Sequence, residues 1–206
     1  MRLFRLSAPT IILLGLWLAL WPGVLAAQTG PGLGSEARVG AALSVRTGAT
    51  WVDGEATPLG ALGGTLRLSS QMELGGEAVA TLRPTRLESE ERPEVSEVSL
   101  GYAGLLLRWT AEEGASSLPF RWRTSLHLGA GRARVSSPVV DAEVTSENFF
   151  FTEPGIQLLF RQDRSVRLSL EAAYRLSTET ERLPELGPEG TRGPSLSLAL
   201  QLVHDP

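Results

Sequence analysis

The chain has 206 residues, a net charge of −4 at neutral pH and no cysteine. This length fits one domain, and the lack of cysteine excludes disulfides, thiol nucleophiles and thiolate metal sites. All 19 basic residues are arginine, but an acidic chain without a basic tract lacks the electrostatic footprint of a nucleic-acid-binding protein.

The first residues have the three parts of a secretory signal. Arg2 and Arg5 form a positive n-region, and an uncharged apolar run over residues 11–21 follows them. That run is shorter than the roughly 20 residues of a membrane-spanning helix, so we expect a cleaved signal rather than an anchor. Ala26 and Ala27 are small residues that suit a signal peptidase. We therefore expect an export signal over residues 1–27, a flexible leader over 28–36 and a single domain over 37–206.

From residue 38 onward, apolar and polar residues alternate with a period of two, which is typical of amphipathic strands. In the clearest stretch, Leu168 and Leu170 share one face, and Arg167 and Glu171 share the other. The pattern predicts eight strands, which lie within residues 38–51, 62–69, 72–83, 95–109, 120–129, 148–161, 165–177 and 195–202.

Two of these strands have a less regular pattern. In the fourth, Val98, Leu100 and Tyr102 are expected on the apolar face, and the run of three leucines that follows suggests a bulge. In the sixth, Pro154 cannot donate a ladder hydrogen bond, so we expect a bulge or a strand end there.

The expected connections differ in length at the two ends of the strands. Those at residues 70–71 and 162–164 are short, and the one at 110–119 is intermediate. Short turns at one end and long loops at the other are typical of outer-membrane barrels. The longer connections are rich in glutamate, proline and glycine, and they lie near residues 52–60, 85–95, 136–147 and 178–194.

The composition of the polar face indicates which face is inside. It mixes arginine and glutamate with glycine, alanine and serine, which suits the narrow, side-chain-filled lumen of an eight-stranded barrel. The apolar face then points outward to lipid, where only a closed sheet satisfies its backbone polar groups. The predicted fold is an all-β, eight-stranded antiparallel up-and-down transmembrane β-barrel. The alternative is a soluble periplasmic β-barrel that binds an apolar ligand, and it requires Leu168, Leu170, Leu196 and Leu198 to point inward.

Charged side chains on the polar face are expected to gather inside the barrel, as a polar conduit or as a plug. Buried charges are costly unless they are paired, and eight strands leave little room, so we predict a salt-bridged plug. The predicted lumen charge network comprises Arg38, Arg46, Arg67, Glu73, Glu77, Arg83, Arg121, Arg123, Glu153, Arg161, Arg167, Glu171 and Arg175, with Glu97 as a further carboxylate.

Aromatic residues lie near the expected strand ends, where a membrane barrel carries its two interface girdles. Ordinary core aromatics are the alternative interpretation. The predicted aromatic girdle comprises Trp51, Trp109, Phe120, Trp122, Phe149 and Phe160.

The sequence offers one weak sign of catalysis and none of a bound cofactor. Ser125 and His127 fall on one face of a strand, but residues two apart lie roughly 6–7 Å from each other, beyond hydrogen-bond reach. Neither a nucleophile elbow nor the spacing of a calcium loop occurs. We therefore expect no catalytic, cofactor or metal site, and a lipid-acting barrel enzyme remains the alternative that depends on this pair.

The signal, the eight alternating strands and the rhythm of short turns and long loops resemble the small outer-membrane β-barrel proteins of the outer membrane protein A and X type. The resemblance covers residues 37–203, and the stretches 153–158 and 171–176 are similar to strands of that family. The chain departs from it at Pro206, where an aromatic residue is common. The resemblance implies a Gram-negative outer-membrane location, a monomer in contact with outer-membrane lipid, and a non-enzymatic structural or surface-interaction role in which the long acidic loops meet surface ligands.

Overall fold

The computed structural model describes residues 40–89, 92–110, 121–137, 142–162, 165–178 and 190–204. The expected signal peptide and leader lie outside these residues, as do Arg38 and Phe120, and the side chain of Arg161 is likewise not described. Within the described part, no helix is long and apolar enough to cross a membrane.

The described residues form nine strands. They are β1 (Ala41–Val52), β2 (Glu55–Arg67), β3 (Met72–Thr81), β4 (Thr85–Ser89), β5 (Arg92–Thr110), β6 (Arg121–Ser137), β7 (Ala142–Gln162), β8 (Val166–Ser177) and β9 (Gly193–His204).

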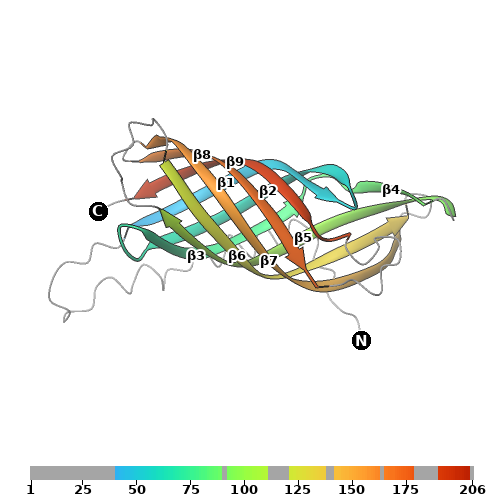
Figure 1. The fold of residues 1–206 in the computed structure, drawn as a ribbon. Coiled ribbons are helices and arrows are strands. Elements are labelled where there is room, and N and C mark those ends of the chain that lie inside the picture. The colour runs from blue at the N-terminus through green and yellow to red at the C-terminus, as the bar shows by residue number, and fades with distance from the viewer. Residues whose placement is uncertain are drawn as a thin grey trace.

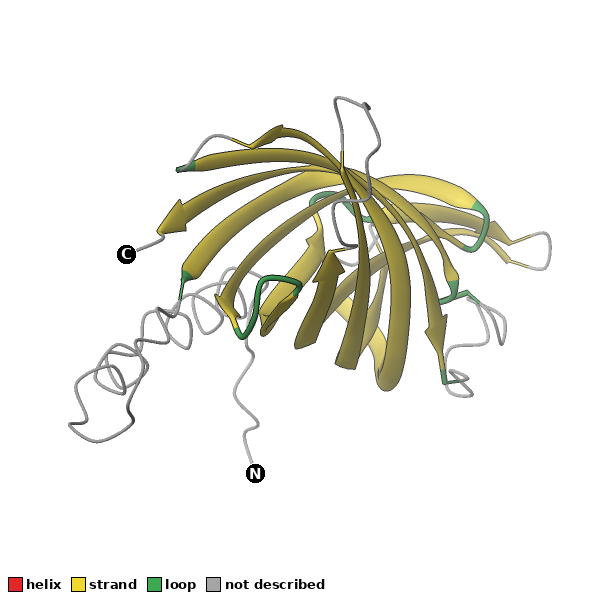
Figure 2. Ribbon diagram, turned by 60° about the vertical axis from the view of Figure 1, so that its left-hand side comes forward, coloured by secondary structure: helices red, strands yellow, loops and turns green. Residues whose placement is uncertain are grey.

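All the strand pairings are antiparallel, and together they close the sheet into a barrel (Figure 1, Figure 2). The first strand, β1, pairs with β9, and β3 and β4 both pair with β5. Because β3 pairs with residues 101–109 of β5 and β4 with its earlier residues, β3 and β4 share one position in the wall. The predicted eight-stranded antiparallel barrel is therefore confirmed.

The two ends of the barrel are easily told apart. Ala41 pairs with His204, so the described chain begins and finishes at the same end as the β2–β3 connection, residues 68–71. We call this the lower end, and we call the end with the β1–β2 turn the upper end.

The last strand shows most clearly which face is outside. Leu196 and Leu198 are 47% and 45% exposed, whereas Gln201, which lies between the outward Leu200 and Leu202, is fully buried. Leu170 of β8 pairs with Leu198, and Leu168 lies two residues earlier on the same face. The apolar face therefore points outward, and the inward orientation that a soluble barrel with an apolar ligand requires is wrong.

Strand β5 has the opposite phase to the one expected from the sequence. Val98, Leu100 and Tyr102 are buried in a cluster inside the barrel rather than placed on its outer face. Apolar side chains occupy the upper lumen, and the outward face of β5 at this height carries Glu97, Ser99 and Gly101, so the polar and apolar faces are exchanged there. Alternation alone therefore did not identify its outward face.

The run of three leucines in β5 does not form a bulge. The pairing between β5 and β6 is regular along its whole length, so Leu105 faces outward and Leu106 faces inward. Strand β7 also continues through Pro154, which pairs with Leu126 of β6 but has no described ladder pair on β8. The described register shifts of β7 lie instead between Leu159 and Arg161 in the pairing with β8, and opposite Val135 and Ser136 in the pairing with β6.

The connection between β1 and β2 is a two-residue turn, not the long loop expected over residues 52–60. Val52 pairs with Glu55, and the two residues between them, Asp53 and Gly54, have φ angles of 51° and 81°. Positive φ at both central residues is the geometry of a type I′ hairpin turn, which favours Asp-Gly. The turn is tied to the rest of the upper end, because the Asp53 N–H donates to the carbonyl oxygen of Gly190 at 3.2 Å, and partial burial raises the pKa of the Asp53 carboxyl.

Strands also occupy much of two other expected loops, those near residues 85–95 and 136–147. As a result β5, β6 and β7 have 19, 17 and 21 residues, against 12 in β8. At about 3.3 Å per residue, β7 is roughly 30 Å longer than β8. Because β8 pairs with β7 only from Phe151 onward, the extra length rises at the upper end, where β4 to β7 form a raised side of the wall (Figure 1).

Candidate functional site

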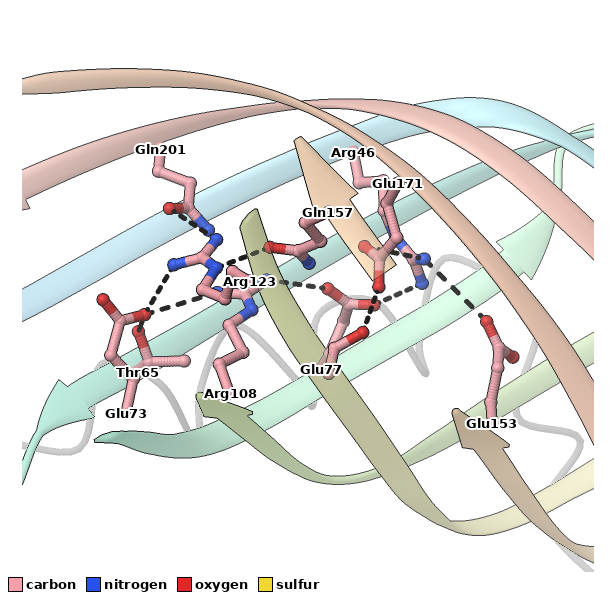
Figure 3. A network of polar contacts seen from close by, with 11 residues as sticks. Arg46, Thr65, Glu73, Glu77, Arg108, Arg123, Glu153, Gln157, Glu171 and Gln201 are labelled. Carbon is pink, nitrogen blue, oxygen red and sulfur yellow. Dashed lines mark hydrogen bonds and ion pairs between the residues drawn. The ribbon is translucent and has the colours of Figure 1, made fainter. Parts of the chain in front are cut away.

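The lower and middle parts of the lumen hold charged side chains that point toward one another (Figure 3). Strand alternation places each of them on the inward face of its strand, and each except Arg167 is almost completely buried. We call this group the lumen cluster; its members are Arg46 (β1), Glu73 and Glu77 (β3), Arg108 (β5), Arg123 (β6), Glu153 (β7), and Arg167 and Glu171 (β8).

Arg46 joins three carboxylates in the middle of the lumen. Its guanidinium donates to Glu77, and it lies 3.4 Å from an oxygen of Glu171 and 3.9 Å from one of Glu153. Glu171 also accepts a hydrogen bond from the Ser125 hydroxyl at 2.7 Å. One guanidinium therefore links carboxylates that come from three different strands.

The arrangement is reversed near the lower end, where one carboxylate serves three cations. Glu73 lies 2.9 Å from Arg167, 3.0 Å from Arg123 and 4.0 Å from Arg108. Arg108 also reaches Glu77 at 3.9 Å and so connects this lower group to the middle one.

Neutral amides complete the shell around Arg123. Its Nε atom donates to the side-chain oxygen of Gln157 at 2.7 Å, and Nη2 donates to that of Gln201 at 3.1 Å. Arg123 and both glutamines are essentially inaccessible to solvent. The guanidinium thus spans the lumen between β7, β9 and β3.

Above the lumen cluster, apolar packing surrounds a smaller set of polar contacts. The Tyr102 hydroxyl donates to Glu153 at 3.0 Å, and the Arg175 guanidinium lies 5.0 Å from the centre of the Tyr102 ring. Arg175 also donates to the carbonyl oxygen of Thr191 at 2.6 Å. The apolar cap that follows consists of Val52, Leu59, Ala61, Val79, Val98, Leu100, Tyr102, Ala133, Val135, Phe149 and Phe151.

Ser125 and His127 do not form a nucleophile and base pair. The Ser125 hydroxyl donates to Glu171, whereas the His127 ring lies between Tyr102 and Phe151 and its nitrogens have no partner among the described residues. Both side chains are buried inside the barrel. The described residues also contain no group of three or more histidine, aspartate or glutamate side chains suited to a metal ion.

Comparison with known proteins identifies the architecture. No protein-family model and no curated protein matches the chain. The solved structure of Neisserial surface protein A is similar, with 10% identity, a TM-score of 0.53, and coverage of 81% of this chain and 97% of that one. A major outer membrane protein from Thermus thermophilus is also similar, with 11% identity, a TM-score of 0.50, and coverage of 80% and 99%. The fold is that of a small outer-membrane β-barrel.

The outer surface agrees with this barrel type. Phe150 and Phe160 of β7 both face outward and are 71% and 47% exposed. With the usual tilt of about 40°, ten residues of strand span roughly 25 Å along the barrel axis, which is the height of a lipid-facing band. The outward residues of β7 between the two phenylalanines are all uncharged; they are Thr152, Pro154, Ile156 and Leu158.

Most of the other aromatic residues predicted for the girdle also lie on the outside of the barrel. Trp109 and Trp122 are exposed near the lower end, and Trp51 is partly exposed near the upper end. The prediction for Phe149 is wrong, because its side chain is buried in the apolar cap. Odd-numbered residues of this part of β7 face inward, so the neighbouring Phe150 takes the outward position.

Not every predicted lumen charge lies in the lumen of the barrel. Arg83 follows the end of β3 and Arg121 begins β6, and both are exposed at the barrel ends. Glu97 faces outward and pairs with Arg86 at 3.6 Å. Arg67 is partly exposed at the lower mouth. Strand alternation alone does not reveal where a strand leaves the barrel, which explains these differences.

Several side chains of the lumen were missed in the sequence. Arg108 was not selected because the leucine run before it obscured the phase of β5, although it lies two residues after the inward Leu106. Gln157 and Gln201 were on the correct face but carry no charge. The hydrogen-bond network of the lumen therefore contains amide side chains as well as charged ones.

Proposed function

We propose that this chain is a non-enzymatic protein of the bacterial outer membrane, with a plugged lumen and a structural or surface-interaction role. The observation that carries the proposal is the combination of an uncharged, apolar outer band with a lumen filled by paired charged side chains. An exposed apolar band of this kind is stable against lipid and costly against water.

The packing of the lumen supports a plug rather than a conduit. Arg108, Arg123 and Arg175 are each no more than 1% exposed, although arginine is among the longest of side chains. Apolar side chains fill much of the lumen above Arg108 and Arg123, and Arg175 lies among them with hydrogen bonds to Thr50 and Thr191. Buried charges that are paired in this way favour a closed interior over a hydrated channel.

The raised side of the wall supports a role at the cell surface. Strands β5, β6 and β7 continue beyond the outward Phe150, so their upper parts stand clear of the lipid-facing band. The outward side chains there include Arg86, Glu97 and Arg132, which are polar and suited to water or to a surface partner. The partners expected on these grounds are outer-membrane lipid around the band and a surface ligand at the raised side, with the protein acting as a monomer.

The location is tested by expressing the full-length chain and separating the membranes of the host. We expect the protein in the outer-membrane fraction, with a folded band that shifts on SDS gels only after heating. Recovery of the native protein from the aqueous periplasmic fraction without detergent would contradict the proposal.

The plug is tested separately by electrical recording from the purified, folded protein in planar lipid bilayers. We expect no stable conductance above the bare bilayer. A reproducible, long-lived open level from folded protein would show a conduit and overturn this part of the proposal, while leaving the membrane location intact.

A further inference from the structure

Two arginines of β6 lie on the outer surface directly above the lipid-facing band. Ala130 pairs with Phe150, which marks the upper edge of the band on β7, and Arg132 is the next outward residue of β6. Arg134 follows on the same face, about 6–7 Å further along the strand. Both side chains therefore start at the height where, in the proposed membrane location, the apolar region of the bilayer meets the headgroups.

Arg132 has hydrogen-bond donors available for a group outside the protein. Its side chain is exposed, and its polar contact among the described residues is the bond from Nε to the Asn148 side-chain oxygen at 3.1 Å. Asn148 thus orients the guanidinium without neutralising it and leaves the N–H groups of both terminal nitrogens for a ligand. Arg134 is half-buried and already engaged by another interaction, so it contributes charge to this position while Arg132 contributes the donors.

The cross-strand neighbours of Arg132 are uncharged. Gly101 lies opposite it on β5, and Asn148 lies opposite it on β7. Further up the outer face of β5, the carboxylate of Glu97 lies 3.6 Å from Arg86 of β4. An anion that approaches Arg132 from outside therefore meets a cation that no carboxylate of the described residues neutralises.

The surface directly below Arg132 is apolar and suits acyl chains. Phe150 is 71% exposed, and Leu128, two outward positions below Arg132 on β6, is 45% exposed. Between them Ala130 pairs with Ala103 of β5, and both alanines are exposed. A ligand that fits both regions has an anionic head above and apolar chains below, which is the form of a membrane lipid rather than of a free anion.

We propose that this surface binds the phosphate group of an anionic lipid in the outer leaflet, with Arg132 as the principal contact and Arg134 as the second cation. The planar guanidinium matches the oxygen geometry of phosphate, and its hydrogen bonds to phosphate are charge-assisted. A phosphate monoester carries a charge of about −1.5 to −2 at neutral pH, so two neighbouring arginines favour it over the diester of a common phospholipid. The inference rests on the proposed outer-membrane location and gives the chemistry of a partner at the base of the raised side.

The test uses the full-length mature protein, folded in a detergent without phosphate, with a fluorophore on Ser70→Cys at the opposite end of the barrel. Lipid A, a glycolipid with phosphate monoesters on its sugars, is titrated by microscale thermophoresis. The same lipid without its phosphates is the reference ligand. We expect the wild type to bind the phosphorylated lipid about tenfold more tightly than the reference, and Arg132→Gln to lose about fivefold in affinity for the phosphorylated lipid alone.

The matched control is Arg121→Gln, which removes an exposed arginine from the lower end of the same strand and is expected to bind both lipids like the wild type. Arg132→Lys keeps the charge but loses the planar fork, so a smaller loss than in Arg132→Gln is expected. Phe150→Ser is expected to weaken both lipids by a similar factor, because the acyl chains do not depend on the phosphate. Without lipid A, Arg132→Gln is expected to unfold like the wild type, because its side chain is exposed.

Equal affinity of the wild type for the two lipids, or equal effects of Arg132→Gln and Arg121→Gln, would overturn the site. Inorganic phosphate that binds as tightly as lipid A would identify a soluble anion as the ligand and overturn the lipid assignment. Because binding is measured on folded protein in detergent, a negative result leaves the membrane location and the plug standing. Recovery of the native protein from the aqueous periplasm contradicts the location whatever the protein binds.

Discussion

Arg46 contacts three buried carboxylates in the middle of the lumen. It contacts Glu77, Glu153 and Glu171, which belong to β3, β7 and β8 and are all nearly inaccessible to solvent. A buried ion pair adds little stability by itself, but removal of one partner leaves the other charge uncompensated in a medium of low dielectric constant. Loss of the Arg46 guanidinium therefore affects three buried carboxylates, whereas loss of one carboxylate leaves Arg46 with two others.

We predict that Arg46→Gln destabilises the folded barrel by roughly 3–5 kcal/mol, the cost of leaving buried carboxylates without their cation. The measurement is urea-induced unfolding in lipid vesicles, followed by tryptophan fluorescence. Arg132→Gln, on an exposed side chain bonded to Asn148, is the control and is expected to change stability by less than about 0.5 kcal/mol. A loss below about 1 kcal/mol in Arg46→Gln would mean that water or protonation already relieves the carboxylates.

Two strand glycines differ in the space around them, and the difference gives a second prediction. A Cβ atom at Gly155 would lie 2.6 Å from the Ser125 hydroxyl and 3.0 Å from Ala173 Cβ, whereas one at Gly76 meets nothing closer than 3.4 Å. We expect Gly155→Ala to cost roughly 1–3 kcal/mol through overpacking and loss of the Ser125–Glu171 hydrogen bond. Gly76→Ala, measured in the same unfolding assay, is expected to be nearly neutral, and equal effects of the two substitutions would rule out steric crowding as the cause.

At the scale of elements, the unexpected phase of β5 leads to a labelling prediction. The chain has no cysteine, so single cysteines report accessibility without a background. In folded protein in vesicles, a lipid-soluble maleimide is expected to label Leu105→Cys and Leu107→Cys but not Leu106→Cys, which lies in the lumen. Labelling of position 106 together with protection of 105 and 107 would restore the phase predicted from the sequence.

Period-two alternation was enough to identify all eight positions in the wall, because one face of most strands is apolar and the other is polar. Strand β9 is the clearest case, with leucine at every second position. The rule fails where the lumen is apolar, as in the upper part of β5, whose apolar side chains face the apolar cap. Lower in β5, two adjacent apolar residues such as Leu105 and Leu106 fit either phase.

The turn between β1 and β2 was missed although its signal was present. Asp-Gly between two alternating segments is the dipeptide that a type I′ turn prefers, and Asp53 and Gly54 have the required positive φ angles. Charge and proline content instead suggested a long loop over residues 52–60. Such a composition indicates exposed residues. The upper end of a long barrel strand is exposed as well, so composition does not distinguish strands from loops.

At the scale of the whole molecule, the sequence predicted a lumen filled with charged side chains, but it did not predict which of these side chains contact one another. Six of the thirteen predicted network residues belong to the lumen cluster and are nearly inaccessible to solvent, namely Arg46, Glu73, Glu77, Arg123, Glu153 and Glu171. Their partners depend on how far each strand is shifted against its neighbours around the barrel, and a single sequence does not contain that stagger. The contacts of Glu73 with three arginines could therefore not be predicted from the sequence.

The barrel's position in a membrane gives the last prediction, which concerns its orientation. Glu55 and Ser70 are both exposed and flank the same strand, Glu55 at the upper end and Ser70 at the lower end. If the raised side of the wall faces the cell exterior, a membrane-impermeant maleimide added to intact cells labels Glu55→Cys, and it labels Ser70→Cys only after the outer membrane is permeabilised. Because the two sites are similar in exposure, unequal labelling reports the barrier between them rather than local reactivity. The reverse pattern would place the β2–β3 turn outside, and equal labelling of both positions in intact cells would show that no membrane separates the two ends.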